Sequence, residues 1–349
     1  MFKSIDISNF RGIRHSRITD FRRINLFFGK NNSGKSTLLE AIFLLSGQSN
    51  PTLPITINNT RGYAFFTPDD VSIEFHNLDS SKRIELTAES NPDRKLAISP
   101  YRPSEGEIDI KSLTSDSSTN TAMPYGLTLT YTLGDDGTVY HSDIIVSGTG
   151  DKQKVNVKID EKYSEPIICR FNTSDSLDMN LTESFAQIIA AKQESSILEA
   201  IRKIDDRITD IHFADGKLLA DIGADKRLPV NMLGDGIRKL LAVLTVIINC
   251  KDGIALIDEI DNGLHFSSMR ILWDAILNTA SEYNVQVFAT THNIDSLQGL
   301  ETVLKGYDEV TKNDISAFKL IRDKQDELHA VRYDYSQFSY AISQALEIR

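Results

Sequence analysis

Cysteine is scarce in this chain. Cys169 and Cys250 are the only two among 349 residues, and they lie far apart beside apolar residues. This excludes the dense disulfide framework of small secreted domains and the paired cysteine spacing of a zinc site. We interpret both as small core residues of a protein from a reducing compartment.

Long hydrophobic runs are also missing. The longest extends from about Leu240 to Ile248 and contains Thr245, whereas a membrane helix needs roughly 20 apolar residues. The N-terminal residues Met-Phe-Lys-Ser-Ile-Asp lack the apolar centre of a signal peptide. The sequence therefore predicts a cytoplasmic protein without a membrane segment.

Positive charge is in deficit. The chain has 38 Lys and Arg against 49 Asp and Glu, a net charge of -11, which argues against a broad surface for coating nucleic acid. One local basic cluster comprises Arg11, Arg14, Arg17, Arg22 and Arg23. We favour a solvated sheet edge as its explanation over a nucleic-acid patch.

The order of apolar patterns predicts an α/β protein. Short strands occupy 1–28, a helix 36–46 and a loop 47–63, and period-2 segments over 71–171, beginning with "VSIEF" at 71–75, predict an antiparallel β lobe. Within this lobe, the low-complexity stretch 112–121 indicates a mobile loop.

The second half alternates helices and strands. Helical spacing over 182–208 precedes a hairpin around Asp215-Gly216. Buried, parallel strands and their helices are predicted after it, at 235–249, 254–258, 267–282, 285–290 and 294–304. Two more strands and a helix near 336–347 close the chain.

The first chemical motif is Gly29-x-x-x-x-Gly34-Lys35-Ser36, between an apolar strand and an amphipathic helix. This is the P-loop pattern, in which glycines let backbone N–H groups face phosphate oxygens. Lys35 supplies a point charge for the β and γ phosphates, and the Ser36 hydroxyl can ligate Mg²⁺. We predict nucleotide contacts from the loop and the first helical turn: Gly29, Lys30, Asn31, Asn32, Ser33, Gly34, Lys35, Ser36 and Thr37.

The second motif is the apolar run 254–257 followed by Asp258-Glu259. Beside a P-loop, the first acid is expected to hold Mg²⁺ and the second to activate the attacking water. A strand that simply ends in a helix-capping acid is the alternative. Asp261 and His265 follow on the outgoing loop, without an assigned role.

The third motif places Thr290-Thr291-His292 at the end of an apolar strand, at the sheet edge where α/β proteins bind ligands. There His292 can bond the γ-phosphate or the attacking water. The fourth motif, Gly234-Asp235-Gly236, opens a long helix. Its N-terminus can bind a second phosphate, in particular the nucleotide of another subunit, or it is simply capped by Asp235.

In this order the motifs resemble the ABC-class ATPase heads of the SMC, RecF and OLD group. The resemblance rests on "ISNFRGI" (7–13), "GKNNSGKS" (29–36), "LGDGIRK" (233–239), "LIDEIDNGLH" (256–265) and "FATTHN" (288–293). It is strongest to the small prokaryotic AAA15/AAA21 ATPases of defence loci, RloA-like or PARIS AriA-like. It implies a single head over 1–349, with a mixed central sheet, an antiparallel β lobe and a helical lobe. The segments it suggests are 1–63, 64–180, 181–252 and 253–349.

The resemblance also implies a mechanism. Two heads pair head-to-tail around two ATP–Mg²⁺, with Lys35, Ser36, Thr37 and Asp258 binding in one chain and Gly234, Asp235 and Gly236 closing from the other. Glu259 and His292 act in hydrolysis, and Arg11 matches an arginine that reaches the nucleotide.

Three features depart from the group's pattern. Gly234 replaces the signature serine, Gln48 is a weak candidate for the Q-loop glutamine, and there is no coiled coil. Because the chain has no room for a nuclease domain, a nuclease or toxin effector is expected on another chain.

Four functions are compared on these motifs. The first is a homodimeric or higher-oligomeric ATPase switch that controls the effector in antiphage defence. The alternative is a RecF-like DNA-repair clamp, with DNA bound by the arginine cluster. A transporter subunit fits "NFRGI" and "DEIDNGLH" poorly, and Glu259 argues against a binder that does not hydrolyse ATP.

Overall fold

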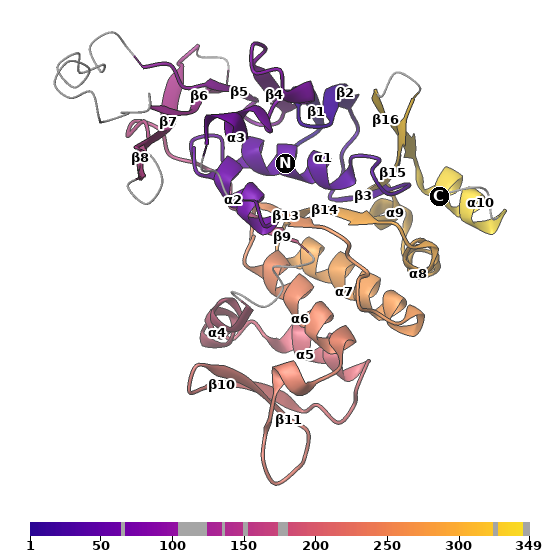
Figure 1. Ribbon diagram of the computed structural model, residues 1–349. Coiled ribbons are helices and arrows are strands. Elements are labelled where there is room, and N and C mark those ends of the chain that lie inside the picture. The colour runs from indigo at the N-terminus through magenta and orange to yellow at the C-terminus, as the bar shows by residue number, and fades with distance from the viewer. Residues whose placement is uncertain are drawn as a thin grey trace.

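The computed structural model describes residues 1–63, 67–103, 124–134, 137–148, 153–173, 181–323 and 327–344. The predicted loop at 112–121 and the end of the predicted helix 336–347 lie outside these ranges. Two sheets are stacked with a helix between them, and further helices cover the outer face of one sheet (Figure 1). This arrangement confirms the predicted α/β class.

The central sheet has six strands in the order β16-β15-β3-β14-β13-β9, and all neighbours pair in parallel except β15 and β16. Because β3, β13 and β14 are covered on both faces, every residue in them is buried, as expected of parallel strands. The strands are β3 (Ile24–Phe28), β9 (Cys169–Asn172), β13 (Ile254–Ile257), β14 (Gln286–Thr291), β15 (Ile315–Arg322) and β16 (Leu328–Tyr333).

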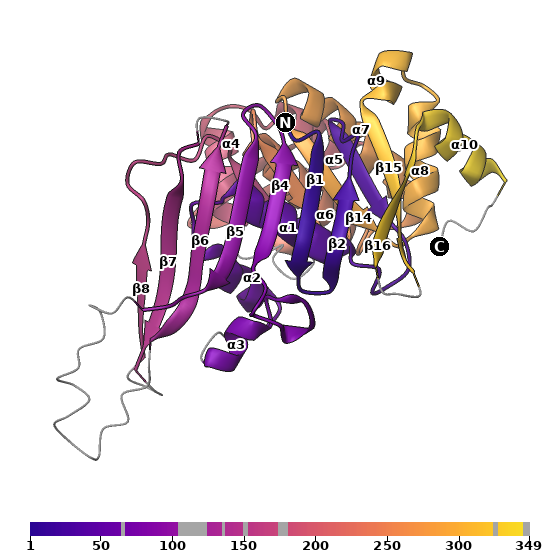
Figure 2. The same cartoon turned by 90° about the horizontal axis from the view of Figure 1, so that it is seen from above.

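The second sheet is the predicted antiparallel lobe, seven strands in the order β2-β1-β4-β5-β6-β7-β8 (Figure 2). Its strands are β1 (Ser4–Phe10), β2 (Ile13–Ile18), β4 (Ile84–Glu89), β5 (Arg94–Pro100), β6 (Tyr125–Leu133), β7 (Tyr140–Ser147) and β8 (Lys154–Lys158). The N-terminal hairpin belongs to this sheet because β1 pairs with β4. Arg14 and Arg17 lie on β2, the first strand in the order, and both are exposed, so their part of the arginine cluster is solvated.

Helix α1 (Lys35–Ser46) lies between the two sheets and contacts strands of both. It is apolar on nearly all sides, so burial on both faces stabilises it. Its first residue follows the loop after β3 at the carboxyl edge of the central sheet. That edge also carries the ends of β13 and β14, since Phe28 pairs with Thr291 and Ile257 with Ala289.

The other face of the central sheet carries the larger helices, and the third sheet extends beyond them (Figure 1). The helices of this side and of the C-terminal part are α4 (Leu181–Ala190), α5 (Ser195–Arg202), α6 (Asp235–Ile248), α7 (Met269–Glu282), α8 (Ile294–Leu304), α9 (Glu309–Asn313) and α10 (Tyr335–Ser343). The third sheet contains β10 (Asp210–Ala214), β11 (Lys217–Asp221) and β12 (Leu228–Pro229), and confirms the hairpin at Asp215-Gly216. Within the described residues, no helix combines the length and the apolar character needed to cross a bilayer.

Two local predictions are wrong. The predicted loop at 47–63 contains α2 (Leu53–Thr60), in which Pro54 occupies the first turn, where its missing N–H is harmless. The predicted strand "VSIEF" at 71–75 overlaps α3 (Pro68–Ser72), which begins with a capping box between Thr67 and Asp70. In both segments a local helix-start signal prevails, over the loop-like composition at 47–63 and over the strand-like alternation at 71–75.

Candidate functional site

The site begins at the loop between β3 and α1. Gly29 (φ +146°) and Gly34 (φ +93°) have backbone conformations that other residues rarely adopt. A Cβ atom on Gly29 would also lie 2.6 Å from the Leu320 carbonyl oxygen. Gly34 is the N-cap of α1 and supplies no side-chain acceptor. The first-turn N–H groups are therefore left for an external anion.

Lys35 turns back over this loop. Its Nζ donates to the carbonyl oxygens of Gly29 at 2.9 Å and Lys30 at 2.8 Å. Burial lowers the pKa of Lys35, and the charges of Asp258 and Glu259 oppose that shift. The motifs that the sequence separates by more than two hundred residues are thus brought within electrostatic reach of one another.

The rest of the loop differs in exposure. Lys30, Asn31 and Asn32 are exposed, while Ser36 and Thr37 in the first helical turn are partly buried. Ser33 is buried, and its hydroxyl has no hydrogen-bond partner within the described residues. A buried hydroxyl without a partner fits a loop whose polar groups are completed by a ligand.

Asp258 and Glu259 follow β13 and are organised by Thr290 on the neighbouring strand β14. The Thr290 hydroxyl donates to Oδ1 of Asp258 and accepts from the Glu259 N–H at 2.8 Å. Glu259 has φ +47°, a left-handed conformation that is uncommon for glutamate. One hydroxyl therefore fixes both carboxylate residues.

His292 follows β14 and stands beside this pair. Its Nδ1 lies 4.0 Å from Oε1 of Glu259, and half of its side chain is exposed. Together with Phe28, Gly29 and Asn31 it lines an open cavity of about 590 Å³. The predicted histidine and the loop thus line one cavity, and the glutamate lies beside the histidine.

The N-terminus of α6 is a separate feature. Its N-cap is Gly234, and the Asp235 side chain, 76% exposed, pairs with Arg238 at 3.2 Å instead of capping the helix. Gly234 and Asp235 are exposed, and Gly236 is partly buried against Leu264. This helix end is open to solvent and available to a second molecule.

The structure gives Arg11 buried partners. Its guanidinium bonds Glu40 at 2.6 Å, Glu74 at 3.2 Å and Asn58 at 2.5 Å, and the side chain is 9% exposed. These contacts hold the β1–β2 turn against α1. A nucleotide contact by Arg11 remains a prediction.

Gln48 is also structural. It is fully buried and donates to the Thr132 carbonyl at 3.0 Å and the Tyr163 hydroxyl at 3.1 Å. It follows the opposite end of α1 from Lys35, about 20 Å away at 1.5 Å per residue. The suggestion that it serves as a Q-loop glutamine is therefore wrong.

Two further residues that the motifs did not indicate lie near the acids. Asn172 ends β9; its carbonyl accepts from Asp258 N–H at 2.9 Å, and its buried Nδ2 finds no partner in the described ranges. Lys239, buried on α6, donates to the Glu259 carbonyl at 3.0 Å. The one available signal was a lysine in the apolar face of an amphipathic helix.

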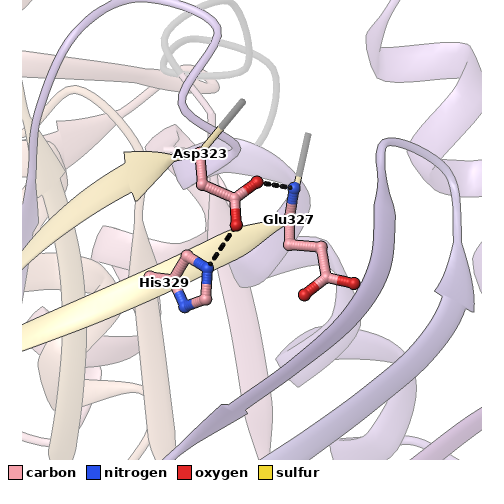
Figure 3. A group of neighbouring side chains, drawn as sticks. All are labelled: Asp323, Glu327 and His329. Atoms are coloured by element: carbon pink, nitrogen blue, oxygen red, sulfur yellow. Dashed lines mark hydrogen bonds and ion pairs between the residues drawn. The ribbon is translucent and has the colours of Figure 1, made fainter. Parts of the chain in front are cut away.

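A separate group of metal-ligating residue types lies at the β15–β16 hairpin (Figure 3). Asp323 accepts from the His329 ring at 2.9 Å and from the Glu327 N–H at 2.9 Å, whereas the Glu327 carboxylate pairs with Arg14. His329 and Asp323 already satisfy each other at the surface. We assign this group no part in nucleotide binding.

Several solved structures resemble this fold at low identity. An SMC head bound to the C-winged helix domain of ScpA is 11% identical, with 95% of this chain and 97% of that chain covered and a TM-score of 0.49. The SMC head domain of Thermotoga maritima is 12% identical, with 95% and 98% covered and a TM-score of 0.42.

Two curated proteins are related in sequence. An "ATP/GTP phosphatase" of Helicobacter pylori is 25% identical over 362 residues, covering 96% of this chain and 95% of that protein. An uncharacterized protein of Methanocaldococcus jannaschii is 48% identical over 44 residues, or 13% of this chain and 20% of that protein. The family described as "AAA domain, putative AbiEii toxin, Type IV TA system" matches residues 24–297. The predicted class of P-loop ATPase is thereby confirmed, and the chain belongs to this family of AAA domains.

Proposed function

We propose that the protein binds and hydrolyses ATP, and that two copies close around the nucleotide. The observation that carries the proposal is the uncapped N-terminus of α1, which begins with Lys35. The negative charges of Asp258 and Glu259 are close enough to Lys35 to favour its charged form. Phosphate oxygens would complete the helix end and draw Lys35 away from the carbonyls of Gly29 and Lys30. The relative named an ATP/GTP phosphatase supports this chemistry.

The chain's own groups would divide the work. Lys35 and the loop N–H groups hold the β and γ phosphates, and Glu259 orients and deprotonates the attacking water. His292, beside Glu259, contacts the γ-phosphate. Thr290 keeps both acids in place by its two hydrogen bonds.

Magnesium fits the same corner. The Ser36 hydroxyl and the Asp258 carboxylate are the hard oxygen ligands that Mg²⁺ prefers. Thr290 bonds Oδ1 of Asp258, and we propose Oδ2 as the metal ligand. When bound, the ion would offset the negative charge of the phosphates.

A second subunit would close the site. Gly234, Asp235 and Gly236 form a helix end with no side-chain cap, open to solvent, and its positive dipole suits a partner's γ-phosphate. The SMC head relatives share the fold at low identity only, so dimerisation rests on this open helix end. Hydrolysis would remove the shared phosphate and release the pair.

A hydrolysis-deficient variant tests this function. Glu259→Gln should lower ATP turnover by about 10²- to 10³-fold, keep ATP binding, and elute as a dimer in gel filtration with ATP and Mg²⁺. Lys35→Ala should bind no ATP, and Glu282→Gln, at an exposed position on α7, is the matched control. The proposal would be contradicted if Glu259→Gln hydrolysed ATP at the normal rate, or if it stayed monomeric in the presence of ATP.

The cycle would serve as a switch for a separate nuclease or toxin in antiphage defence. The family description names a putative toxin and a toxin–antitoxin system, which supports a role in such a system. Co-expression with the neighbouring genes, followed by purification with and without ATP, tests the role. A partner retained in one nucleotide state and released in the other is the expected result.

A DNA clamp is the second candidate, favoured by the exposed Arg14 and Arg17 on β2. It requires that duplex DNA stimulate ATP turnover and that Arg17→Ala abolish the stimulation. Unchanged turnover with DNA leaves the effector switch as the function.

A further inference from the structure

Lys239 is a buried cation outside the predicted site. Its side chain emerges from α6 and is 2% exposed, although lysine is almost never fully buried without a partner. Its Nζ donates to the backbone carbonyl of Glu259 at 3.0 Å. The contact joins the helix that opens at Gly234 to the residue proposed to activate water.

Three acids share the surroundings of this ammonium. The negative charges of Asp261, Glu259 and Asp258 all favour the charged form of Lys239. Asp261 is itself 5% exposed, and its Oδ1 has no hydrogen-bond partner inside the described ranges. Burial lowers the pKa of Lys239, and the charges of these three carboxylates oppose that shift only in part. Lys239 is thus a buried cation whose nearest charges are the acids of the proposed site.

The backbone of Glu259 is held from two directions. Thr290 accepts from its N–H, while Lys239 donates to its carbonyl oxygen. The residue also has a left-handed φ of +47°, which persists only when neighbouring groups enforce it. Removing one of the two contacts frees the peptide to relax.

Lys239 is also close to the open end of α6. It follows Gly236 by three residues, about 4.5 Å along the helix axis. A shift of this helix end on meeting a partner's nucleotide would therefore move the group that holds Glu259. The helix end that would meet the partner and the lysine that holds Glu259 both belong to α6.

We propose that Lys239 is a positioning residue that aligns Glu259 and links it to the position of the α6 N-terminus. The inference rests on the proposed ATP hydrolysis. Lys239 touches no phosphate in this role; it acts through the Glu259 peptide.

The test compares turnover with nucleotide affinity. Lys239→Met keeps the length of the side chain and removes the ammonium, and should lower kcat by about tenfold or more. The dissociation constant for a fluorescent ATP analogue should stay within about threefold of wild type, because the P-loop is untouched. Lys239→Arg, which restores a charged donor, should recover part of the lost kcat, and Lys251→Met, at an exposed position just past α6, should match wild type.

Two results overturn the inference: a kcat less than fivefold below wild type, or an equal loss of kcat and nucleotide affinity. If Lys239→Met does not fold, Lys239→Leu, which also lacks a donor to the Glu259 carbonyl, decides by the same thresholds. An inactive wild-type protein would instead refute the proposed hydrolysis, so the two failures are distinguishable.

Discussion

At the scale of single residues, one hydroxyl holds the acidic pair together. Thr290 lies on β14, is fully buried, and bonds both the Asp258 carboxylate and the Glu259 N–H. No local sequence pattern links it to residues thirty positions away. Its contribution comes from the parallel pairing of β13 and β14.

We expect Thr290→Val to lower kcat by about 10²-fold while ATP affinity changes by about threefold or less. Valine has nearly the same shape but cannot bond either acid, so both lose their alignment while the P-loop keeps its own. Steady-state ATPase assays and equilibrium nucleotide binding measure the two quantities.

Thr245→Val is the control, because Thr245 is also buried but its hydroxyl has no partner within the described part of the chain. That variant should hydrolyse ATP at the wild-type rate. Equal activity in both variants would show that Thr290 is only a packing residue.

The motifs could be recognised in the sequence because each one is a short, continuous stretch of residues. Lys35, Asp258, Glu259 and His292 could each be identified from a strand that runs into a polar group, and the structure brings them together. Lys239 escaped notice because its bond to Glu259 depends on how α6 packs against the sheet.

At the scale of elements, the two ends of α1 are treated differently. Its N-terminus is uncapped, while its last carbonyls, of Leu45 and Ser46, accept from Arg94 on β5 at 3.1 and 3.2 Å. Arg94 is 1% exposed and also pairs with Glu165 at 2.5 Å. The antiparallel sheet therefore anchors the helix that begins at the P-loop.

We expect Arg94→Met to reduce the free energy of unfolding by about 3 kcal/mol, since it leaves the two α1 carbonyls without a donor and removes the charge partner of Glu165. Urea denaturation monitored by circular dichroism measures the loss.

Arg83→Met provides the comparison, because Arg83 forms an exposed pair with Glu85, worth at most about 1 kcal/mol. A loss for Arg94→Met no larger than for Arg83→Met would mean that water replaces the buried contacts.

Periodicity identified the elements that are strongly patterned. The helix predicted at 235–249 and the strand predicted at 254–258 match α6 and β13 closely. The short helices α2 and α3 were missed because a capping residue or an early proline decides them, not a repeated apolar face. Sheet membership also escaped prediction, since β1 joins β4 across a long stretch of chain.

At the scale of the whole molecule, the proposed site has two parts, the P-loop with its acidic pair and the N-terminus of α6. The P-loop meets the acidic pair at the sheet edge, and the α6 N-terminus opens to solvent with nothing within 4 Å of a Cβ built on Gly234. A complete site would then need one feature from each of two copies.

Mixing two inactive variants tests this arrangement. Lys35→Ala cannot bind ATP, and Gly234→Glu places a carboxylate against the partner's γ-phosphate without crowding its own chain. Each variant alone should be inactive. An equal mixture should regain about a quarter of wild-type activity, because half the dimers are mixed and each holds one intact site.

A mixture of wild type with Lys35→Ala shows that the subunits exchange. Continued inactivity of the two-variant mixture, despite such exchange, would mean that each chain hydrolyses ATP unaided.

The seven-stranded sheet ends differently on its two sides. β2 contacts β16, whereas β8 is the last strand in order and all five of its residues are exposed. Lys154 and Lys158 bracket Val155 and Val157 there. The like charges of these two lysines oppose pairing with the same strand of a second molecule. They therefore discourage edge-to-edge aggregation at the exposed strand β8.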